Sequence, residues 1–111
     1  MSKRVQKNIH LLSLLCVCTK KQRNAILTTI TKDQLLAICE CVDNVLAGNV
    51  KLNQKDFDKI KKQKSLFREI RKKSVPPNVK KEYLVQSGGA LPALLIPAIT
   101  LATSLIGSLI R

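Results

Sequence analysis

The segment from Lys51 to Lys73 holds the side chains best suited to bind a ligand, and the ligand chemistry that they favour is phosphate. Ammonium and guanidinium groups pair with phosphate oxygens and release the counterions that surround a nucleic acid. This segment has only three acidic residues against ten basic ones, which are Lys51, Lys55, Lys59, Lys61, Lys62, Lys64, Arg68, Arg71, Lys72 and Lys73. Lysines on several sides of one segment suit phosphate neutralisation rather than base reading. We therefore expect sequence-independent binding.

The whole chain is strongly basic, with a net charge of +13 over 111 residues. Such a charge predicts attraction to polyanions, either nucleic acid or acidic lipid. The three aromatic residues, Phe57, Phe67 and Tyr83, are too few for a platform that stacks single-stranded bases. We expect salt-sensitive binding of double-stranded DNA, or its condensation when many copies act together. The alternative is that the lysines only form a solvated surface.

Residues with catalytic or metal-binding chemistry are sparse. The chain has one histidine, His10, seven acidic residues, and neither a G-x-S-x-G nor a P-loop motif. We expect no enzymatic activity and no cofactor. The four cysteines form two C-x-C pairs, Cys16 with Cys18 and Cys39 with Cys41. Residues i and i+2 of a helix point to different sides, so we expect buried thiols in a reducing compartment, with neither a metal site nor disulfides.

The spacing of apolar residues predicts an all-α fold, a small bundle of three to four short helices plus a hydrophobic C-terminal helix. Helices are expected over about 3–17 and 20–28, and a central one begins at the Thr31 capping box and ends at Gly48. The basic segment is expected to form one helix capped by Asn53. Its apolar stripe consists of Phe57, Ile60, Phe67 and Ile70. Two prolines at 76–77 end it, and 78–86 is predicted to form one or two helical turns or an extended arm.

The C-terminal region changes composition at Ser87-Gly88-Gly89. Residues 1–86 are expected to form a basic helical domain, and residues 87–111 a glycine joint followed by a hydrophobic tail. No charged residue occurs from Ala90 to Ile110, which is long enough to cross a hydrocarbon layer. The expected membrane-contacting residues are Ala90, Leu94, Leu95, Ile96, Ile99, Leu101, Leu105, Ile106, Leu109 and Ile110. Burial of the tail against its own domain or a partner protein is the alternative.

Three segments carry a resemblance to a known family: QLLAICECVDNVLAGNVKL, KKQKSLFREIRKK and LVQSGGALPALL. Their order resembles that of small basic late proteins of polinton-type transposons and adintoviruses, which are similar to the adenovirus core protein pX (mu). The resemblance covers about 5–110. It implies a virion core protein that condenses DNA, present in the virion and, during assembly, in the host nucleus or cytoplasm with some membrane association.

The resemblance also gives the glycine pair a second interpretation. Adenovirus-type cysteine proteases cut at or near such pairs, and the resemblance implies cleavage at Gly88-Gly89-Ala90, between Gly89 and Ala90. Gln86 departs from the large aliphatic residue that such proteases favour. Cleavage would separate a basic packaging domain from a lipophilic peptide.

Three hypotheses for function follow. The first is a non-enzymatic virion or mobile-element core protein that binds DNA through 51–73 and a membrane or the inner capsid surface through its tail. The second is a tail-anchored or membrane-active minor capsid protein whose lysines contact anionic lipid. The third is a capsid cement whose tail packs into a coat-protein groove. Further expected partners are a viral cysteine protease and other copies of the chain.

Overall fold

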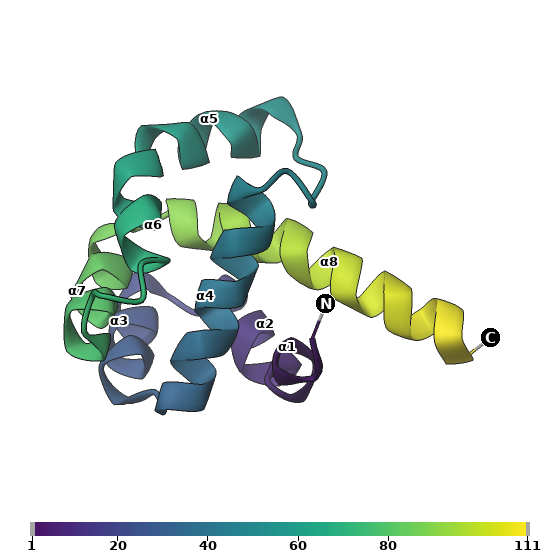
Figure 1. Cartoon of the computed structure of the whole chain (residues 1–111), viewed down its shortest axis with the longest axis horizontal. Coiled ribbons are helices and arrows are strands. Elements are labelled where there is room, and N and C mark those ends of the chain that lie inside the picture. Colours follow the sequence, from purple (N-terminus) through teal and green to yellow (C-terminus); the bar gives the residue numbers. More distant parts are fainter. Residues whose placement is uncertain (1, 111) are drawn as a thin grey trace.

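The computed structural model describes the main chain of residues 2–110 and the side chains of residues 2–102. The described residues form eight α-helices and no strand (Figure 1). The helices are α1 (Lys3–Lys7), α2 (Ile9–Val17), α3 (Lys20–Thr29), α4 (Lys32–Leu46), α5 (Gln54–Lys62), α6 (Lys64–Ile70), α7 (Pro77–Gln86) and α8 (Ala90–Ile110). The all-α prediction is confirmed, and the predicted number of three to four short helices is wrong.

Two breaks account for most of the difference in number. Asn8 leaves the helical conformation, with φ −102° and ψ 15°, and separates α1 from α2. Its side-chain amide donates to the Arg4 carbonyl at 2.9 Å and to the Asp33 carboxylate at 3.0 Å. Gln63 has a similar conformation, φ −111° and ψ 18°, and divides the predicted basic helix into α5 and α6. Each predicted long helix is therefore two short helices.

Local capping signals fix where several helices begin. Thr19 with Gln22 and Thr31 with Gln34 both form complete capping boxes at the starts of α3 and α4. The Asn53 side chain accepts a hydrogen bond from the Asp56 main-chain N–H at 2.8 Å and caps α5, as predicted. These side chains satisfy N–H groups that have no partner inside the helix.

The end of α4 is also set by its sequence. Gly48 has φ +80°, the left-handed region that glycine adopts most easily. The Gly48 N–H donates to the Val45 carbonyl, and the Asn49 N–H donates to the Asn44 carbonyl at 2.9 Å. This pair of bonds is the Schellman arrangement that satisfies the last carbonyls of a helix. The chain is thereby turned towards α5.

The core is built around α4 and the first half of α8. The buried residues of α4 are Leu35, Ala37, Ile38, Cys39, Cys41, Val42 and Val45. Helix α8 packs against α2, α4 and α5, and its buried residues are Ala90, Leu91, Ala93, Leu94, Leu95, Ala98 and Ala102. Burying one large aliphatic side chain stabilises a fold by about 1.5–3 kcal/mol. Helix α8 supplies seven of the buried apolar residues that the structure describes, so the tail forms much of the core.

The first half of α8 packs inside the bundle, and the division into residues 1–86 and 87–111 stays a prediction. Between α7 and α8 the chain bends by 104°, so Ala90–Ala102 turns back into the bundle instead of leading away from it. Within residues 2–102, whose side chains the structure describes, no long apolar helix stands apart from the bundle. No single helix in the described part could cross a membrane by length and apolar composition, although α7 and Ala90–Ala102 pass that criterion together as a bent pair. Of the predicted membrane-contacting residues, Leu105, Ile106, Leu109 and Ile110 lie outside the described side chains.

Candidate nucleic-acid interface

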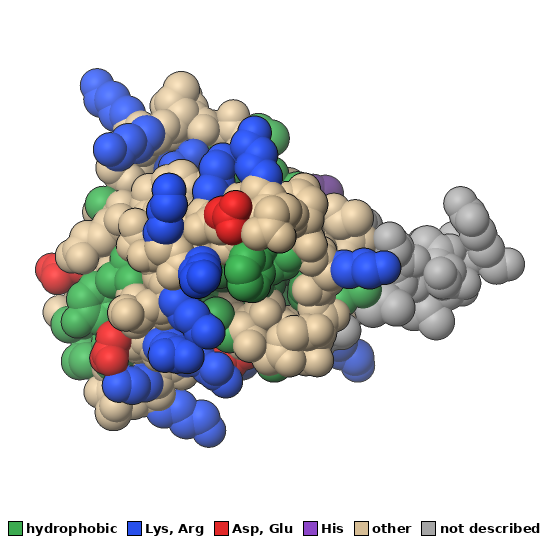
Figure 2. Space-filling model, turned by 90° about the horizontal axis from the view of Figure 1, so that it is seen from above, with side chains coloured by type: hydrophobic (Ala, Val, Ile, Leu, Met, Phe, Trp, Pro, Cys, Tyr) green, Lys and Arg blue, Asp and Glu red, His purple; other side chains and the backbone are tan. Residues whose placement is uncertain are grey.

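The ten predicted phosphate-binding residues are all exposed in the structure. They come from the loop before α5, from α5 and α6, and from the turn that follows α6. We call these residues together the α5–α6 basic surface: Lys51, Lys55, Lys59, Lys61, Lys62, Lys64, Arg68, Arg71, Lys72 and Lys73. The view from the side of α5 shows many basic side chains and few acidic ones (Figure 2).

Buried apolar residues hold this surface in place. Ile60 of α5 and Phe67 and Ile70 of α6 are almost fully buried. Helix α5 packs on α8, and α6 packs on α4 and α7. Because the apolar side of each helix faces the core, its lysines point to solvent. Phe57 was predicted to belong to the same stripe, but this residue is 47% exposed, whereas Ile60 on the same helix is buried.

Few of these cations are engaged by acidic groups of the same chain. The Arg71 guanidinium lies 2.8 Å from the Asp43 carboxylate, and the Lys72 ammonium lies 2.6 Å from Glu69. The other eight have no carboxylate within ion-pair distance among the described residues. On α5 itself, Asp58 accepts a hydrogen bond from the Gln54 amide. Eight unpaired cations therefore remain available for an external polyanion.

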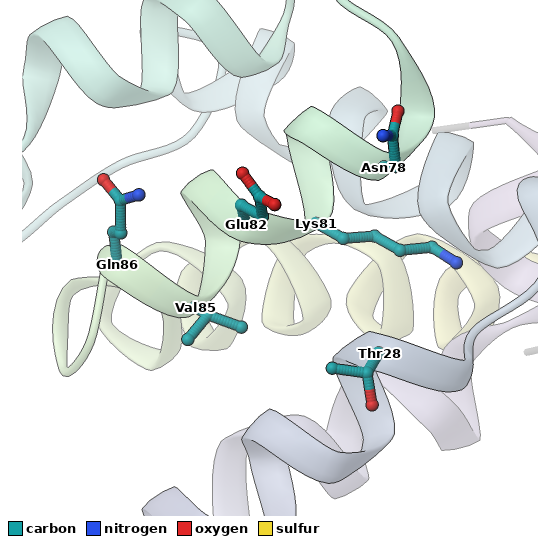
Figure 3. Close-up of a pocket in the computed structure, with 6 residues that line it drawn as sticks. All are labelled: Thr28, Asn78, Lys81, Glu82, Val85 and Gln86. Atoms are coloured by element: carbon teal, nitrogen blue, oxygen red, sulfur yellow. The ribbon is translucent and has the colours of Figure 1, made fainter.

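Two further lysines, Lys80 and Lys81, belong to α7. Lys80 is buried, with 7% of the residue exposed. Lys81 is half-buried and lines an open hollow of about 550 Å³ between α3 and α7, together with Thr28, Asn78, Glu82, Val85 and Gln86. Figure 3 shows the Lys81 side chain reaching across the hollow towards α3. The wall of the hollow carries two opposite charges and one apolar side chain.

A smaller pocket borders the α5–α6 basic surface and was not predicted from the sequence. It has a volume of about 180 Å³ and lies between the end of α4 and the helices α5 and α6. We call it the Phe57 pocket; its lining residues are Val45, Leu46, Leu52, Phe57, Ile60, Lys61 and Lys64. Five of them are apolar and two are lysines of the basic surface. The sequence did not indicate the pocket, because the spacing of Phe57 predicted that it packs in the apolar stripe.

The cysteines behave as small apolar residues. Cys39 and Cys41 are buried in α4, Cys16 and Cys18 are half-buried at the end of α2, and all four are free thiols. Burial raises the pKa of Cys16 to about 11 and that of Cys41 to about 12. Burial also raises the pKa of Cys39, whose thiol lies 3.8 Å from the Ile70 carbonyl. These three thiols stay protonated at neutral pH, and the described residues contain no cluster of three or more metal-ligating side chains.

The glycine joint is folded into a turn and tied to a distant helix. Gly88 has φ +56°, and its carbonyl accepts a hydrogen bond from the Arg23 guanidinium at 3.5 Å. Gly89 is exposed, whereas Ser87 and Ala90 on either side are buried. A protease that binds its substrate in an extended conformation would have to unwind this turn before cleaving after Gly89.

Comparisons of the chain with models of protein families, with curated proteins and with solved structures gave no match.

Proposed function

We propose that the protein binds double-stranded DNA without sequence preference through the α5–α6 basic surface. The observation that carries this proposal is the group of eight exposed cations on two adjacent helices and their flanking turns, none of them within ion-pair distance of a described carboxylate. Neutralising phosphates with such groups releases counterions, which supplies most of the free energy of non-specific binding.

The form of the surface favours a duplex over a single strand. Stacking of unpaired bases needs several exposed aromatic side chains. Phe57 is the one exposed phenylalanine in the chain, Phe67 is fully buried and Tyr83 is partly buried. Lysines and arginines spread over two helices and the flanking turns instead suit a row of phosphates along a duplex. With a chain charge of +13, many copies bound side by side would also condense the DNA.

The proposal extends to the setting in which such a protein acts. We infer a non-enzymatic core protein of a virion or mobile element, acting in the particle and in the host nucleus or cytoplasm during assembly. Its support is the basic charge together with the resemblance of three sequence segments to late proteins of polinton-type elements. Mass spectrometry of purified particles tests it, and absence of the chain from them would overturn this part.

DNA binding is tested by titrating a fluorescent duplex of random sequence at several salt concentrations. Replacing Lys59, Lys61, Lys62 and Lys64 with glutamine is expected to weaken binding by at least tenfold. The slope of the logarithm of the association constant against the logarithm of the salt concentration should also become less negative, by roughly 0.9 for each phosphate that the variant no longer neutralises. The matched control replaces Lys3, Lys20, Lys21 and Lys32, which are exposed elsewhere and carry the same total charge. Equally weakened binding in both variants would mean that net charge alone, not this surface, binds DNA.

A second candidate function is contact with a membrane surface, and a separate observation favours it. Helices α2 and α8 contain no Lys, Arg, Asp or Glu and pack against each other. Their exposed sides carry Leu14, Val17 and Ile96, which are 46%, 81% and 51% exposed. Apolar groups of this size are well suited to insert at the headgroup boundary while nearby lysines contact anionic lipid.

Flotation with vesicles of phosphatidylcholine and phosphatidylserine tests the membrane proposal. Replacing Val17 and Ile96 with serine is expected to abolish flotation while leaving DNA binding unchanged. The Lys59, Lys61, Lys62 and Lys64 variant should reduce flotation only on vesicles that contain phosphatidylserine. Flotation that survives the serine substitutions would argue against insertion by α2 and α8.

A further inference from the structure

The Phe57 pocket has features that DNA binding does not use. Its wall is formed mainly by apolar side chains from the end of α4, the loop before α5 and α5 itself. Phosphates and sugars are hydrophilic, so a duplex lying on the lysines would leave this wall uncovered. Phe57, one of only two phenylalanines in the chain, stays 47% exposed there. Aromatic residues, phenylalanine among them, are enriched at protein interfaces relative to the rest of the surface.

The size of the pocket limits what can fill it. Pockets that hold drug-sized ligands have volumes of roughly 300–1,000 Å³. The Phe57 pocket has about 180 Å³, which is below that range. A space of this volume accommodates a single large aliphatic or aromatic side chain. It is too small to enclose a long acyl chain.

The charge at the rim determines the character of the partner. Lys61 and Lys64 line the pocket, and neither has a carboxylate within ion-pair distance among the described residues. A second copy of this chain brings a charge of +13 and would be repelled. The complementary partner carries carboxylates on both sides of an apolar side chain.

We propose that the Phe57 pocket binds an acidic peptide segment of a partner protein, with one leucine-sized side chain inserted beside Phe57 and flanking carboxylates paired with Lys61 and Lys64. Both lysines also belong to the α5–α6 basic surface. The partner therefore displaces DNA from this end of the surface, a consequence that rests on the proposed DNA binding. The insertion itself does not depend on it.

The experiment uses the full chain and two fluorescent twelve-residue peptides. Each consists of glutamate and glycine around one central residue, which is leucine in the probe and serine in its matched control. The leucine peptide is expected to bind at least tenfold more tightly. Phe57→Ala should remove this preference and leave the affinity for duplex DNA unchanged, with the unfolding midpoint measured to confirm that the variant is folded. Equal binding of the two peptides to the unaltered protein would overturn the proposal.

Three further measurements separate this inference from the proposed function. The double variant Lys61→Gln, Lys64→Gln should weaken both peptide and DNA binding, whereas Lys51→Gln, Lys55→Gln, which does not touch the pocket, should weaken chiefly DNA binding. The leucine peptide should compete with DNA for the unaltered protein. Selective peptide binding without any DNA binding would support the pocket and overturn the proposed function. Dodecanoate binding that depends on Phe57, with no leucine preference among peptides, would overturn the assignment of a peptide partner.

Discussion

The guanidinium of Arg23 joins the glycine joint to the end of another helix. Its Nε donates to the Leu15 carbonyl at 3.1 Å, near the end of α2, and its Nη1 donates to the Gly88 carbonyl at 3.5 Å. A cation at the carbonyl end of a helix is favourable, and both acceptors are main-chain groups of segments far apart in the sequence. One side chain of α3 thus holds α2 and the α7–α8 turn together.

Replacing Arg23 with methionine is expected to lower the free energy of unfolding by about 1–2 kcal/mol, because hydrogen bonds from a charged donor are removed at a half-buried site. Urea denaturation measures this. Cleavage between Gly89 and Ala90 by an adenovirus-type cysteine protease should become faster in the variant, because the turn opens more often. The matched control is Arg68→Met, an exposed arginine without an ion pair among the described residues, which should change neither quantity. Equally fast cleavage of the unaltered folded protein would contradict the role given to Arg23.

The burial of α8 predicts that residues 90–102 are required for folding. Leu94→Ala should destabilise the protein by about 2–5 kcal/mol, since Leu94 is fully buried. Ile96→Ala, two residues further along the same helix and half-exposed, should cost less than about 1 kcal/mol. Thermal unfolding followed by circular dichroism compares the two. Similar small effects would mean that α8 is not part of the core in solution.

Truncation examines the same region without relying on a single side chain. A chain ending at Ala102 keeps every buried residue of α8 described above and should unfold cooperatively. A chain ending at Gly89 lacks them and should not. A cooperative transition in the shorter chain would instead support the two-part organisation predicted from composition.

A side chain at Gly48 is expected to destabilise the protein through the main-chain conformation of this residue. Its φ of +80° is unfavourable for any residue with a Cβ atom, and no atom lies within 4 Å of the position that this Cβ would take. Gly48→Ala should therefore cost about 1–2 kcal/mol purely through the main chain. Gly89→Ala is the control, because Gly89 has equally open surroundings and no positive φ; it should change stability by less than about 0.5 kcal/mol. Chemical denaturation of both variants measures the two changes in the free energy of unfolding, and equal changes would contradict the role of the positive φ.

Asp33 predicts a pH dependence of stability. Hydrogen bonds from Asn8 and Arg4 lower the pKa of Asp33 below its usual value. Its stabilising contribution is therefore fully present above the unfolded-state pKa of about 3.9 and is lost as the pH falls through the lower pKa of the folded state. Between about pH 5 and pH 2, Asp33→Asn should lose less stability than the unaltered protein. Parallel acid-unfolding curves for the two would contradict this.

The parts of the fold that depend on neighbouring residues could be predicted from the sequence. Thr19, Thr31 and Asn53 begin helices and Gly48 ends one, since each acts on main-chain groups within a few positions. The break at Asn8 could not be predicted, because its side chain also bonds to Asp33, which is distant in the sequence. The exposure of the ten basic residues within 51–73 could be predicted, because charged side chains are mostly solvated, although Lys80 shows that packing can bury an individual lysine.

The direction of the apolar tail was not predictable from composition. An uncharged segment is compatible with a bilayer, a partner protein or the interior of its own domain, and its sequence alone does not choose among them. Leu94 and Leu95 are buried here because the turn at Gly88 directs α8 between α2, α4 and α5. The Phe57 pocket was missed for a related reason. Phe57 and Ile60 fall on one stripe in the sequence, but within α5 Ile60 is buried and Phe57 is half-exposed.

The packing of α2 against α8 has a consequence for how quickly the native state is reached. These two helices lie at opposite ends of the sequence, so their association closes a loop that contains most of the chain. Closing a long loop costs conformational entropy before any interaction compensates for it, and proteins rich in such non-local pairings fold more slowly than helical bundles built from neighbours. Early in folding, the apolar side of α2 therefore stays exposed to water until α8, the last helix of the chain, packs against it.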